Sequence, residues 1–430
     1  MKKQTSCADP FETDAISVDE AQKIIIQKIT PIKKSEKLDL RSCLNRYLAE
    51  DVYSPINVPS HTNSAMDGYA IASDDLPTKT MQSYSVNGTA YAGRASTDTH
   101  KAGHVIRIMT GAVMPRGTDT VIMQEQVEIV DTLAADSPNV VIKPEHKKGQ
   151  NVRQAGEDIA KGCLVLSKGK QITPADLGIL ASLGISELNV YQRPRIAFFT
   201  TGDELRSIGE TLAEGEIYDS NRYTLFGMLK QQNVEIIDMG VVRDTQESIH
   251  DAFIKSSKVA DIVITSGGVS VGDADYIKPT LKALGDTHFW KIAMKPGRPL
   301  TFGTLNTSTT TASNASFFGL PGNPVAVMVT FLQFLQPAIH YLASGKIKKP
   351  LSLQAISIDN IPKRAGRTEY QRGIFEQTTE GIITVRRTGK QGSGILTSMS
   401  IANCFIVLSA ESKGISSGDT VRIQPFSGTV

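Results

Sequence analysis

The sequence predicts a multidomain α/β protein that contains a mostly parallel sheet with helices on both of its faces. With 430 residues, the chain is too long for one ordinary hydrophobic core. From Arg195 onward, strand-like and helix-like segments alternate regularly, which is typical of a parallel sheet covered on both sides. Residues 55–155 and 350–430 have short strands and glycine turns, which indicates β-rich regions on either side.

The composition excludes several classes of protein. Hydrophobic residues make up 40% of the chain and charged residues 21%, and the net charge of +2 gives no electrostatic reason to expect nucleic acid or an anionic membrane as a partner. Cys7, Cys43, Cys163 and Cys404 are far apart, so the sequence supports neither a zinc site nor a disulfide framework. Residues 1–14 are polar, and no apolar run approaches the length of a membrane span. We therefore expect a cytoplasmic protein with reduced thiols.

The sequence of the first half of the chain predicts a helical region, then a region of strands, and then a region in which the pattern is mixed. Residues 15–50 have helical spacing, and Ser17 with Glu20 forms a capping box. Strands are expected at 84–86, 105–109, 121–124 and 140–142. In the following mixed region, Thr173 is a suitable N-cap for a helix whose first residue is Pro174.

The second half carries the α/β alternation. Strands are predicted at 196–199, 234–239 and 262–265, and helices at 218–231, 245–258, 276–284 and 324–342. Ligands of such sheets bind beyond the carboxyl ends of the strands. Three loops with acidic residues follow these strand ends, at 200–204, 242–244 and 266–275, so we expect them to converge on one edge. Residues 306–316 are of low complexity and predict a mobile loop.

The turn after the third strand is the most informative local feature. Ser266, Gly267 and Gly268 have almost no side chain, so an anion can approach the backbone N–H groups closely. Asp273 and Asp275 follow at once, and glycines followed by carboxylates suit a phosphorylated ligand with a metal ion. The alternative is an ordinary tight turn between strand and helix.

The other acidic loops allow similar pairs of interpretations. Asp203 and Glu204 are candidates to bind Mg²⁺ or to orient a leaving group, and the alternative, which we favour for Asp203 alone, is a capped loop. Asp244 is either a functional carboxylate or the N-cap of the next helix. Asp275 lies where the first turn of a helix is predicted, a position that favours a carboxylate in any case.

Two segments offer positive charge or amide donors to an anion. Lys291 and Lys295 are predicted on one face of an extended strand next to Arg298 and Pro299, and the alternative is a solvated strand edge. In the second segment, residues 319–324, Asn323 is a suitable N-cap after Pro321 and Gly322. The free N-terminus of that helix would also attract an anion.

One motif predicts a different chemistry. Gly268, Ser270 and Gly272 match the nucleophile elbow of hydrolases, which needs a histidine base. His288 and His340 follow in the chain, but neither lies in a loop with supporting acids, so we disfavour a hydrolase. Dinucleotide and Walker A motifs are both missing from the sequence.

Eight segments, taken in order, resemble the MoeA/gephyrin family of molybdopterin molybdenumtransferases. They are 63–70, 107–111, 151–158, 201–205, 217–222, 266–276, 295–299 and 319–326. The resemblance implies a linking region (1–54 with 156–190), an inserted β domain (55–155), an α/β molybdopterin-binding domain (191–345) and a C-terminal β-barrel (346–430). It also implies a homodimer with a shared cleft. Arg298 stands where many members have lysine, which keeps the charge but changes the donor geometry.

The implied reaction is insertion of molybdate into adenylylated molybdopterin with Mg²⁺-assisted release of AMP. The implied catalytic residues are Asp67, Thr110, Asp158, Glu204, Asp244, Asp275, Lys291 and Lys295. The implied binding residues are Arg153, Ser266, Gly267, Gly268, Ser270, Arg298, Pro299, Pro321, Gly322, Asn323, Arg367 and Ser398. The metal ligands would be Glu204, Asp244 and Asp275. A molybdopterin adenylyltransferase and maturation proteins of molybdoenzymes are the implied partners. The alternative functions are an adenylyltransferase and a gephyrin-like scaffold.

Overall fold

The chain forms two compact units in a computed structural model that describes residues 15–130, 138–268, 276–289, 291–306 and 314–426. Unit 1 comprises residues 1–36, 45–47 and 190–430. Unit 2 comprises residues 37–44 and 48–189. The proposed site lies on unit 1, and a second group of predicted residues lies on unit 2.

Unit 1 contains a six-stranded sheet in the order β16-β13-β17-β21-β20-β18. The strands are β13 (Arg195–Thr201), β16 (Glu235–Val242), β17 (Ile262–Ser266), β18 (Gly285–Phe289), β20 (Thr301–Leu305) and β21 (Ala315–Leu320). β16, β13, β17 and β21 are parallel, whereas β20 is antiparallel to both of its neighbours. The carboxyl ends of the four parallel strands therefore share one edge of the sheet, which confirms the predicted mostly parallel sheet.

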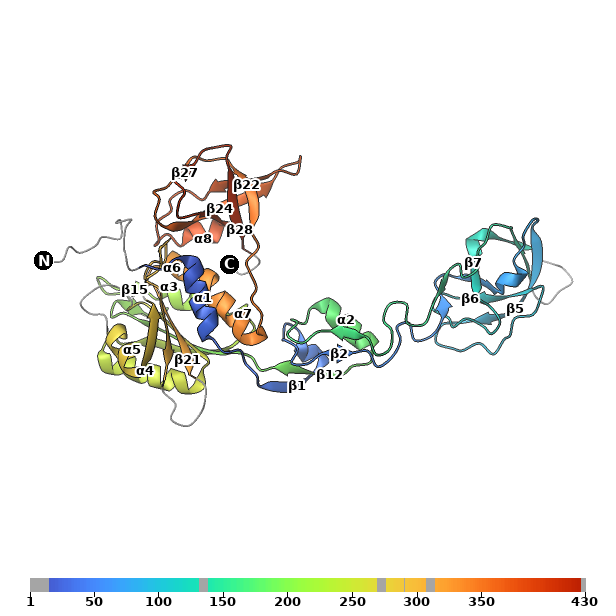
Figure 1. The fold of residues 1–430 in the computed structure, drawn as a ribbon, viewed down its shortest axis with the longest axis horizontal. Coiled ribbons are helices and arrows are strands. Elements are labelled where there is room, and N and C mark those ends of the chain that lie inside the picture. The colour runs from blue at the N-terminus through green and yellow to red at the C-terminus, as the bar shows by residue number, and fades with distance from the viewer. Residues whose placement is uncertain (1–14, 131–137, 269–275, 290, 307–313, 427–430) are drawn as a thin grey trace. The chain divides into compact units, whose positions relative to one another are not determined.

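Helices cover both faces of this sheet (Figure 1). They are α3 (Ser220–Lys230), α4 (Gln246–Val259), α5 (Ile277–Leu284) and α6 (Pro324–Thr330). Side chains alternate along each strand, so Phe198 and Ile264 pack in one core with α3 and α6. Phe199 and Val263 belong to a second core with α4 and α5. The predicted doubly wound arrangement is confirmed.

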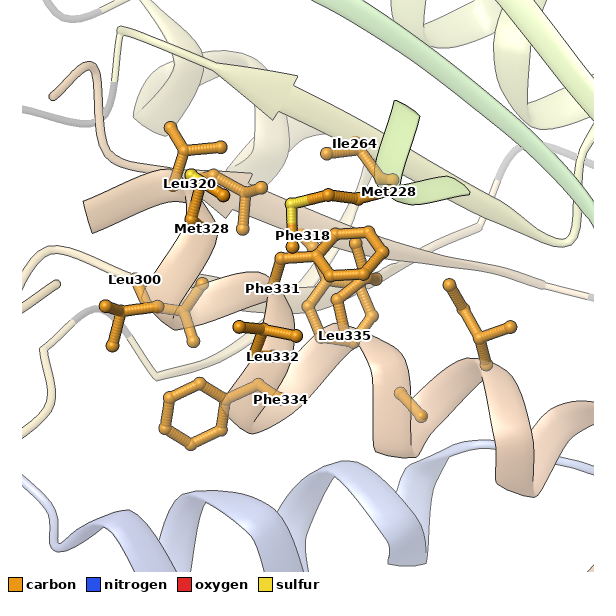
Figure 2. Packing of buried hydrophobic residues seen from close by; sticks show 14 of the residues in the cluster. Met228, Ile264, Leu300, Phe318, Leu320, Met328, Phe331, Leu332, Phe334 and Leu335 are labelled. Atoms are coloured by element: carbon orange, nitrogen blue, oxygen red, sulfur yellow. The ribbon is translucent and has the colours of Figure 1, made fainter. Parts of the chain in front are cut away.

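The largest apolar segment is a helix in the core of unit 1. It runs through α6, a π-helical turn at Phe331–Leu335 and α7 (Gln336–Ser344). Figure 2 shows Met228 of α3 and Phe318 of β21 packed against Phe331 of this segment. At 21 residues the segment is long and apolar enough to cross a membrane, contrary to our expectation, but 78% of its most apolar stretch is buried inside the protein. We conclude that it is a core helix.

A closed five-stranded barrel forms the C-terminal part of unit 1. Its strands are β22 (Leu353–Ser357), β24 (Thr368–Gln377), β25 (Ile383–Arg387), β26 (Cys404–Leu408) and β28 (Thr420–Pro425), and the short helix α8 (Thr397–Ile401) precedes β26. The barrel closes because β24 pairs with both β25 and β26. Short β19 (Met294–Lys295) pairs in parallel with β24, and β23 (Ile361–Pro362) pairs with β27 (Gly414–Ile415). The predicted barrel is confirmed.

Unit 2 contains another six-stranded sheet, in the order β7-β4-β6-β5-β9-β8. The strands are β4 (Gly68–Ile71), β5 (Gln82–Ala90), β6 (His104–Ile108), β7 (Thr120–Met123), β8 (Val127–Val130) and β9 (Asn139–Ile142). Two ribbons accompany it, β3 (Asn63–Ser64) with β10 (Val152–Arg153) and β2 (Val52–Tyr53) with β11 (Leu164–Leu166). All four strands predicted in this region are present. Helix α2 (Pro174–Ser182) begins with the predicted cap, Thr173, paired with Asp176 in a capping box.

The prediction of helical structure through residues 15–50 was only partly right. Helix α1 (Val18–Lys28) begins at the predicted cap, where the Glu20 N–H donates to Ser17 Oγ at 3.1 Å. It ends before Pro31, because the residue before a proline avoids the helical conformation. A strand β1 (Ser35–Asp39) and a short 3₁₀ turn (Leu40–Cys43) follow, and β12 (Glu187–Tyr191) lies much later in the chain.

The three described cysteines are free. Cys43 and Cys404 are buried and Cys163 is exposed. Burial raises the pKa of Cys404 to about 12, which keeps that thiol protonated and unreactive. This fits the expectation of thiols that form no disulfide framework.

Candidate functional site at the carboxyl edge of the sheet

Strand register brings the predicted loops to one edge of the unit 1 sheet. Thr200 of β13 pairs with Ser266 of β17, and Thr201 pairs with Val242 of β16. Ser266 in turn pairs with Leu320 of β21. The residues that follow these four strand ends, 202–204, 243–244, 267–268 and 321–323, are therefore neighbours.

The turn after β17 requires glycine at two consecutive positions. Gly267 and Gly268 have φ of +92° and +64°, in the left-handed region that favours glycine. A Cβ on Gly267 would lie 2.5 Å from the carbonyl oxygen of Thr201, and one on Gly268 would lie 2.6 Å from Ile277 Cδ1. The turn therefore packs against Thr201 and Ile277 as closely as glycine allows. Ser270, Asp273 and Asp275 lie outside the described residues.

The predicted carboxylates line the next two strand ends. The Glu204 carboxylate folds over Gly202, where an added Cβ would lie 2.5 Å from Glu204 Oε2. The backbone N–H of Asp244 donates to Asp203 Oδ1 at 3.5 Å, which links the loops after β13 and β16. Asp244 is not the cap of α4, because Thr245 Oγ1 accepts the Ser248 N–H at 3.3 Å. The interpretation of Asp244 as the N-cap of this helix is therefore wrong.

The oxygen donors at this edge suit a magnesium ion shared with a ligand. Mg²⁺ is usually held by one or two carboxylates together with phosphate oxygens, rather than by a complete cage of side chains. Glu204 and Asp244 supply two such carboxylates from the ends of adjacent strands, β13 and β16. Within the described part of the chain, no group of three His, Cys, Asp or Glu residues is arranged to hold a metal by itself. The third predicted ligand, Asp275, is not among those residues.

The predicted cations lie close to the same edge, but not on one extended strand. Lys291 follows β18, and Arg298 precedes β20, whose first residue pairs with Gly319. Only Met294 and Lys295 form a strand, because the Ile292 N–H turns back to the Arg298 carbonyl at 3.0 Å. The prediction that Lys291 and Lys295 share a strand face is therefore wrong.

Lys295 is held by the barrel. Pairing of β19 with β24 places Lys295 beside Glu369, and Lys295 Nζ lies 3.5 Å from Glu369 Oε1. Gln371 Nε2 donates to the other Glu369 oxygen at 3.1 Å. Burial lowers the pKa of nearby Lys363, and the negative charge of Glu369 partly offsets that effect. Sequence analysis missed Glu369, because nothing in the local pattern reveals which strand lies next to Lys295.

Ser398 and Arg367 differ in their surroundings. Arg367 is half-buried, in the turn before β24. Ser398 is buried; its hydroxyl accepts from Arg372 Nε at 3.0 Å and donates to the Ile395 carbonyl at 2.6 Å. Burial lowers the pKa of Arg372 to about 10. The contacts of Ser398 therefore support Arg372.

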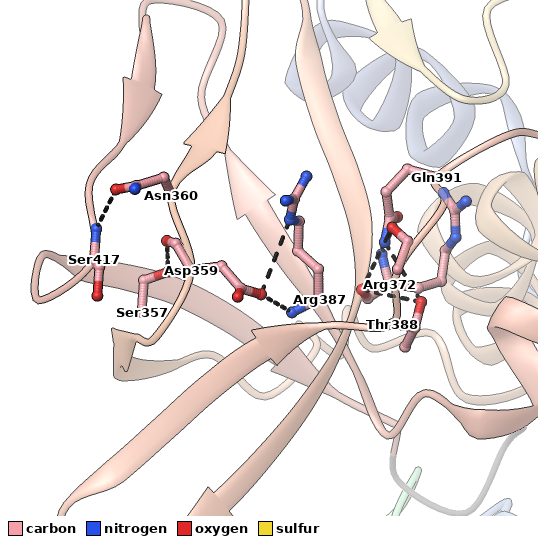
Figure 3. A network of polar contacts seen from close by, with 9 residues as sticks. Ser357, Asp359, Asn360, Arg372, Arg387, Thr388, Gln391 and Ser417 are labelled. Atoms are coloured by element: carbon pink, nitrogen blue, oxygen red, sulfur yellow. Dashed lines mark hydrogen bonds and ion pairs between the residues drawn. The ribbon is translucent and has the colours of Figure 1, made fainter.

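A polar network continues from Arg372 across the barrel (Figure 3). The Gln391 side chain bonds both backbone groups of Arg372. Its Oε1 accepts the Arg372 N–H at 2.8 Å, and its Nε2 donates to the Arg372 carbonyl at 3.1 Å. Further along, the Arg387 N–H donates to Asp359 Oδ2 at 2.7 Å. These bonds fix the loop at 388–393 against the barrel.

The turn after β21 is less open than predicted. Asn323 is the N-cap of α6, as expected, but its side chain makes no capping hydrogen bond. The Val325 N–H donates to the Ser393 carbonyl at 3.1 Å. The prediction of a free helix N-terminus at this point is therefore wrong, because the barrel loop at 388–393 already uses one of its amides.

The two histidines are held by neutral oxygens. His288 Nε2 lies 3.0 Å from Thr304 Oγ1, and His340 Nδ1 lies 3.1 Å from the Lys346 carbonyl. Burial lowers the pKa of both rings. Their contacts are structural, which gives the hydrolase alternative no support.

In unit 2, the carboxylate of Asp67 lies where three loops come together. Asp67 Oδ1 accepts the Thr110 N–H at 2.6 Å and the Thr110 hydroxyl at 2.7 Å. These two bonds, with a smaller contribution from Arg107, hold the pKa of Asp67 below its ordinary value. Asp67 therefore stays ionised.

The third loop, which contains Arg153, lies next to the Asp67 loop because strand β10 pairs with strand β3. Arg153 of β10 pairs with Asn63 of β3, and the Ala65 N–H donates to the Asn151 carbonyl at 2.8 Å. Arg153 and Asp158 are both exposed. The structure thus gathers segments 63–67, 109–111 and 151–153, which the sequence left separate.

The fold and the edge define a class. A doubly wound sheet with glycine turns, carboxylates and cations beyond its strand ends is an α/β protein built to bind a phosphorylated ligand. Family models divide the chain accordingly: the MoeA N-terminal region (domain I and II) matches residues 16–184, a probable molybdopterin binding domain matches 197–341, and the MoeA C-terminal region (domain IV) matches 354–426.

Individual proteins are similar to this chain over almost the whole length of both sequences. A molybdopterin molybdenumtransferase of Haemophilus influenzae is 44% identical over 96% of this chain and 98% of its own length. One from a Nostoc species is 36% identical over 93% of this chain and 90% of its own. The crystal structure of a molybdopterin biosynthesis MoeA protein from Pyrococcus horikoshii aligns with a TM-score of 0.81 at 29% identity, covering 96% of this chain and all of that one. The chain belongs to the MoeA family, which confirms the resemblance.

Proposed function

We propose that this protein is a molybdopterin molybdenumtransferase, which inserts molybdate into adenylylated molybdopterin and releases AMP. The observation that carries the proposal is the carboxyl edge of the unit 1 sheet. There, the Ser266–Gly268 turn lies next to the carboxylate loops of Glu204 and Asp244. Such an edge provides amide donors for a phosphate and carboxylates for a cation on neighbouring strands.

Each group at this edge has a role in the proposal. The turns at Ser266–Ser270 and Pro321–Asn323 hold the phosphate of the pterin. Lys291, Lys295 and Arg298, with Pro299 keeping the loop rigid, neutralise molybdate and the charge that develops on the phosphate. Glu204, Asp244 and Asp275 orient the reacting groups and would hold Mg²⁺. When bound, that ion supplies positive charge to the pyrophosphate link. Arg367 would extend the binding site, and Ser398 would contribute to it through Arg372, which it supports.

We further propose that the protein acts as a homodimer. Six large apolar side chains are exposed between residues 208 and 226: Ile208, Leu212, Ile217, Tyr218, Tyr223 and Phe226. Several exposed apolar side chains in one segment of the chain favour an interaction site, and a second copy of the chain is the proposed occupant. Asp67, Thr110, Arg153 and Asp158 of unit 2 would act in the same reaction, in a cleft shared by the two copies. This is why we assign them catalytic and binding roles although they lie on a separate unit.

The remaining proposals concern the organisation and setting of the protein. We retain the four parts 1–54 with 156–190, 55–155, 191–345 and 346–430 as its functional domains. The burial of the long apolar helix at Pro324–Ser344 supports a cytoplasmic location. The proposed protein partners are a molybdopterin adenylyltransferase, which would supply the substrate, and maturation proteins of molybdoenzymes, which would take the product.

AMP release from purified protein tests the function. The protein is incubated with adenylylated molybdopterin, MgCl₂ and molybdate, and AMP is measured against a Glu204→Gln, Asp275→Asn double variant. The matched control is a Glu235→Gln, Asp261→Asn double variant, which changes one carboxylate at the amino end of each of β16 and β17. We expect molybdate-dependent AMP from wild type and control only.

Three outcomes would contradict the proposal. Wild-type AMP release no higher than that of the Glu204→Gln, Asp275→Asn variant would exclude it. Conversion of ATP and free molybdopterin to the adenylylated form would identify an adenylyltransferase instead. Clustering of a receptor without any turnover would point to the scaffold.

A further inference from the structure

The first turn of α3 contacts each of the four parallel strands of the unit 1 sheet or the turn that follows it. Asp219, the N-cap, accepts the Thr200 hydroxyl of β13 and the Arg222 N–H. The Arg222 guanidinium pairs with Asp238 of β16 at 2.9 Å. Asn221 reaches the remaining two strand ends. A helix start needs only its cap, so these additional contacts serve the edge of the sheet.

Asn221 joins the two glycine turns of the proposed phosphate site. Its Nδ2 donates to Ser266 Oγ at 3.0 Å and to the Gly322 carbonyl at 2.6 Å. The turns lie directly against each other, since a Cβ added to Gly322 would be 3.9 Å from the Gly267 Cα. One side chain therefore sets the distance between both backbone segments that would surround the phosphate.

Two buried polar atoms beside these turns have no partner among the described residues. They are Asn221 Oδ1 and Thr201 Oγ1. Thr201 is only 3% exposed, and its hydroxyl lies 2.9 Å from the point where a Cβ on Gly268 would be. A buried polar group without a hydrogen bond costs free energy, so a partner is expected from outside the chain.

We propose that Asn221 is a positioning residue for the phosphorylated pterin, and that the Thr201 hydroxyl is a further donor to the same ligand. Asn221 holds the Ser266–Gly268 turn and the Gly322 turn so that their amides face one phosphate group. Thr201 donates from beneath the first turn. This inference rests on the proposed function for the identity of the ligand, and it adds two residues to the binding site.

Equilibrium binding of molybdopterin, without molybdate, tests the inference apart from turnover. The variants are Asn221→Ala and Asn306→Ala. Asn306 is the matched control: it follows β20 at the opposite edge of the same sheet and donates to Asp286 Oδ2 at 3.4 Å. We expect Asn221→Ala to weaken binding about tenfold and Asn306→Ala to bind like the wild type.

Steady-state kinetics separate a positioning role from a general structural one. In Asn221→Ala, the KM for adenylylated molybdopterin should rise about tenfold while the KM for molybdate stays unchanged. Thr201→Val should weaken molybdopterin binding a few-fold, on the order of one hydrogen bond, and Thr201→Ser should restore it. This second pair of variants keeps the test valid if Asn221→Ala unfolds.

The outcomes also distinguish this inference from the proposed function. Wild-type affinity in both Asn221→Ala and Thr201→Val would overturn the inference whether or not AMP is released. Weakened binding in both variants, in a protein that releases no AMP, would support the positioning role and contradict molybdenum transfer.

Discussion

The carboxyl edge of unit 1 and the Asp67 loops of unit 2 hold their polar groups in opposite ways. At the edge, the glycine turns present backbone groups, and side chains such as Asn221 and Asp219 hold these turns and their neighbours in place. In unit 2 the central group is a side chain, and a backbone N–H together with a hydroxyl keeps it ionised. The first arrangement suits an incoming anion; the second presents a fixed negative charge.

The largest effect should come from a side chain placed in the turn of unit 1. In Gly267→Ala, the new Cβ would lie 2.5 Å from the Thr201 carbonyl oxygen, on a residue with φ of +92°. We expect a loss of about 3 kcal/mol or more in the free energy of unfolding, together with loss of molybdopterin binding. Denaturant unfolding and molybdopterin titration would measure the two effects.

Gly209→Ala is the matched control for that substitution. Gly209 has the same φ of +92°, but nothing lies within 4 Å of its added Cβ. Gly209→Ala should lower the free energy of unfolding by roughly 1 kcal/mol, which is the cost of placing alanine at a positive φ, and should leave molybdopterin binding unchanged. Equal losses in the two variants would show that the close approach to Thr201 is unimportant.

The second prediction removes the negative charge in unit 2. Asp67→Asn keeps the shape of the side chain and an oxygen for Thr110, so the fold should persist. AMP release should fall about a hundredfold if the charge acts on the reaction. The control is Asp119→Asn, because Asp119 also accepts from one residue's N–H and hydroxyl, those of Ser73, both at 2.7 Å. Full activity in Asp67→Asn would remove unit 2 from the proposed mechanism.

The third prediction concerns pH. The hydrogen bonds from Thr110 stabilise the ionised form of Asp67 and therefore lower its pKa. The contribution of the ionised carboxylate is fully present above the ordinary pKa of an aspartate. It is lost as the pH falls through the lowered pKa of Asp67. Thr110→Val removes one of these bonds and raises the pKa. The acid limb of the pH–rate profile for AMP release should therefore move to higher pH. An unmoved limb would show that another group governs it.

Much of the unit 1 site could be predicted, because its residues follow strand ends in a regular pattern. The glycine turn at Gly267 and the acid at Glu204 needed only the rule that parallel strands share a carboxyl edge. The prediction of one extended strand through Lys291 and Lys295 was wrong, because the Ile292 N–H donates to the Arg298 carbonyl and turns the chain back.

Contacts between distant segments could not be predicted from local patterns. Glu369 lies beside Lys295 only because β19 pairs with β24. The loops of Asp67 and Arg153 meet only through the pairing of β3 with β10. β3, β10 and β19 are each two residues long, too short for periodicity to reveal their register. The role of Asn221 likewise depends on bonds to residues 45 and 101 positions away.

The smallest effect should come from adding a methyl group next to Thr110. Gly111 has φ of +82°, but its added Cβ would meet only Ala92 Cβ, at 3.8 Å. Gly111→Ala should therefore cost roughly 1 kcal/mol of unfolding free energy from backbone strain, and AMP release should stay within about twofold of wild type. The reason is that the site in unit 2 depends on side-chain bonds between Asp67 and Thr110, which the methyl group leaves in place. A loss of binding comparable to that of Gly267→Ala would mean that unit 2 also presents its backbone to the ligand, and the contrast between the two regions would fail.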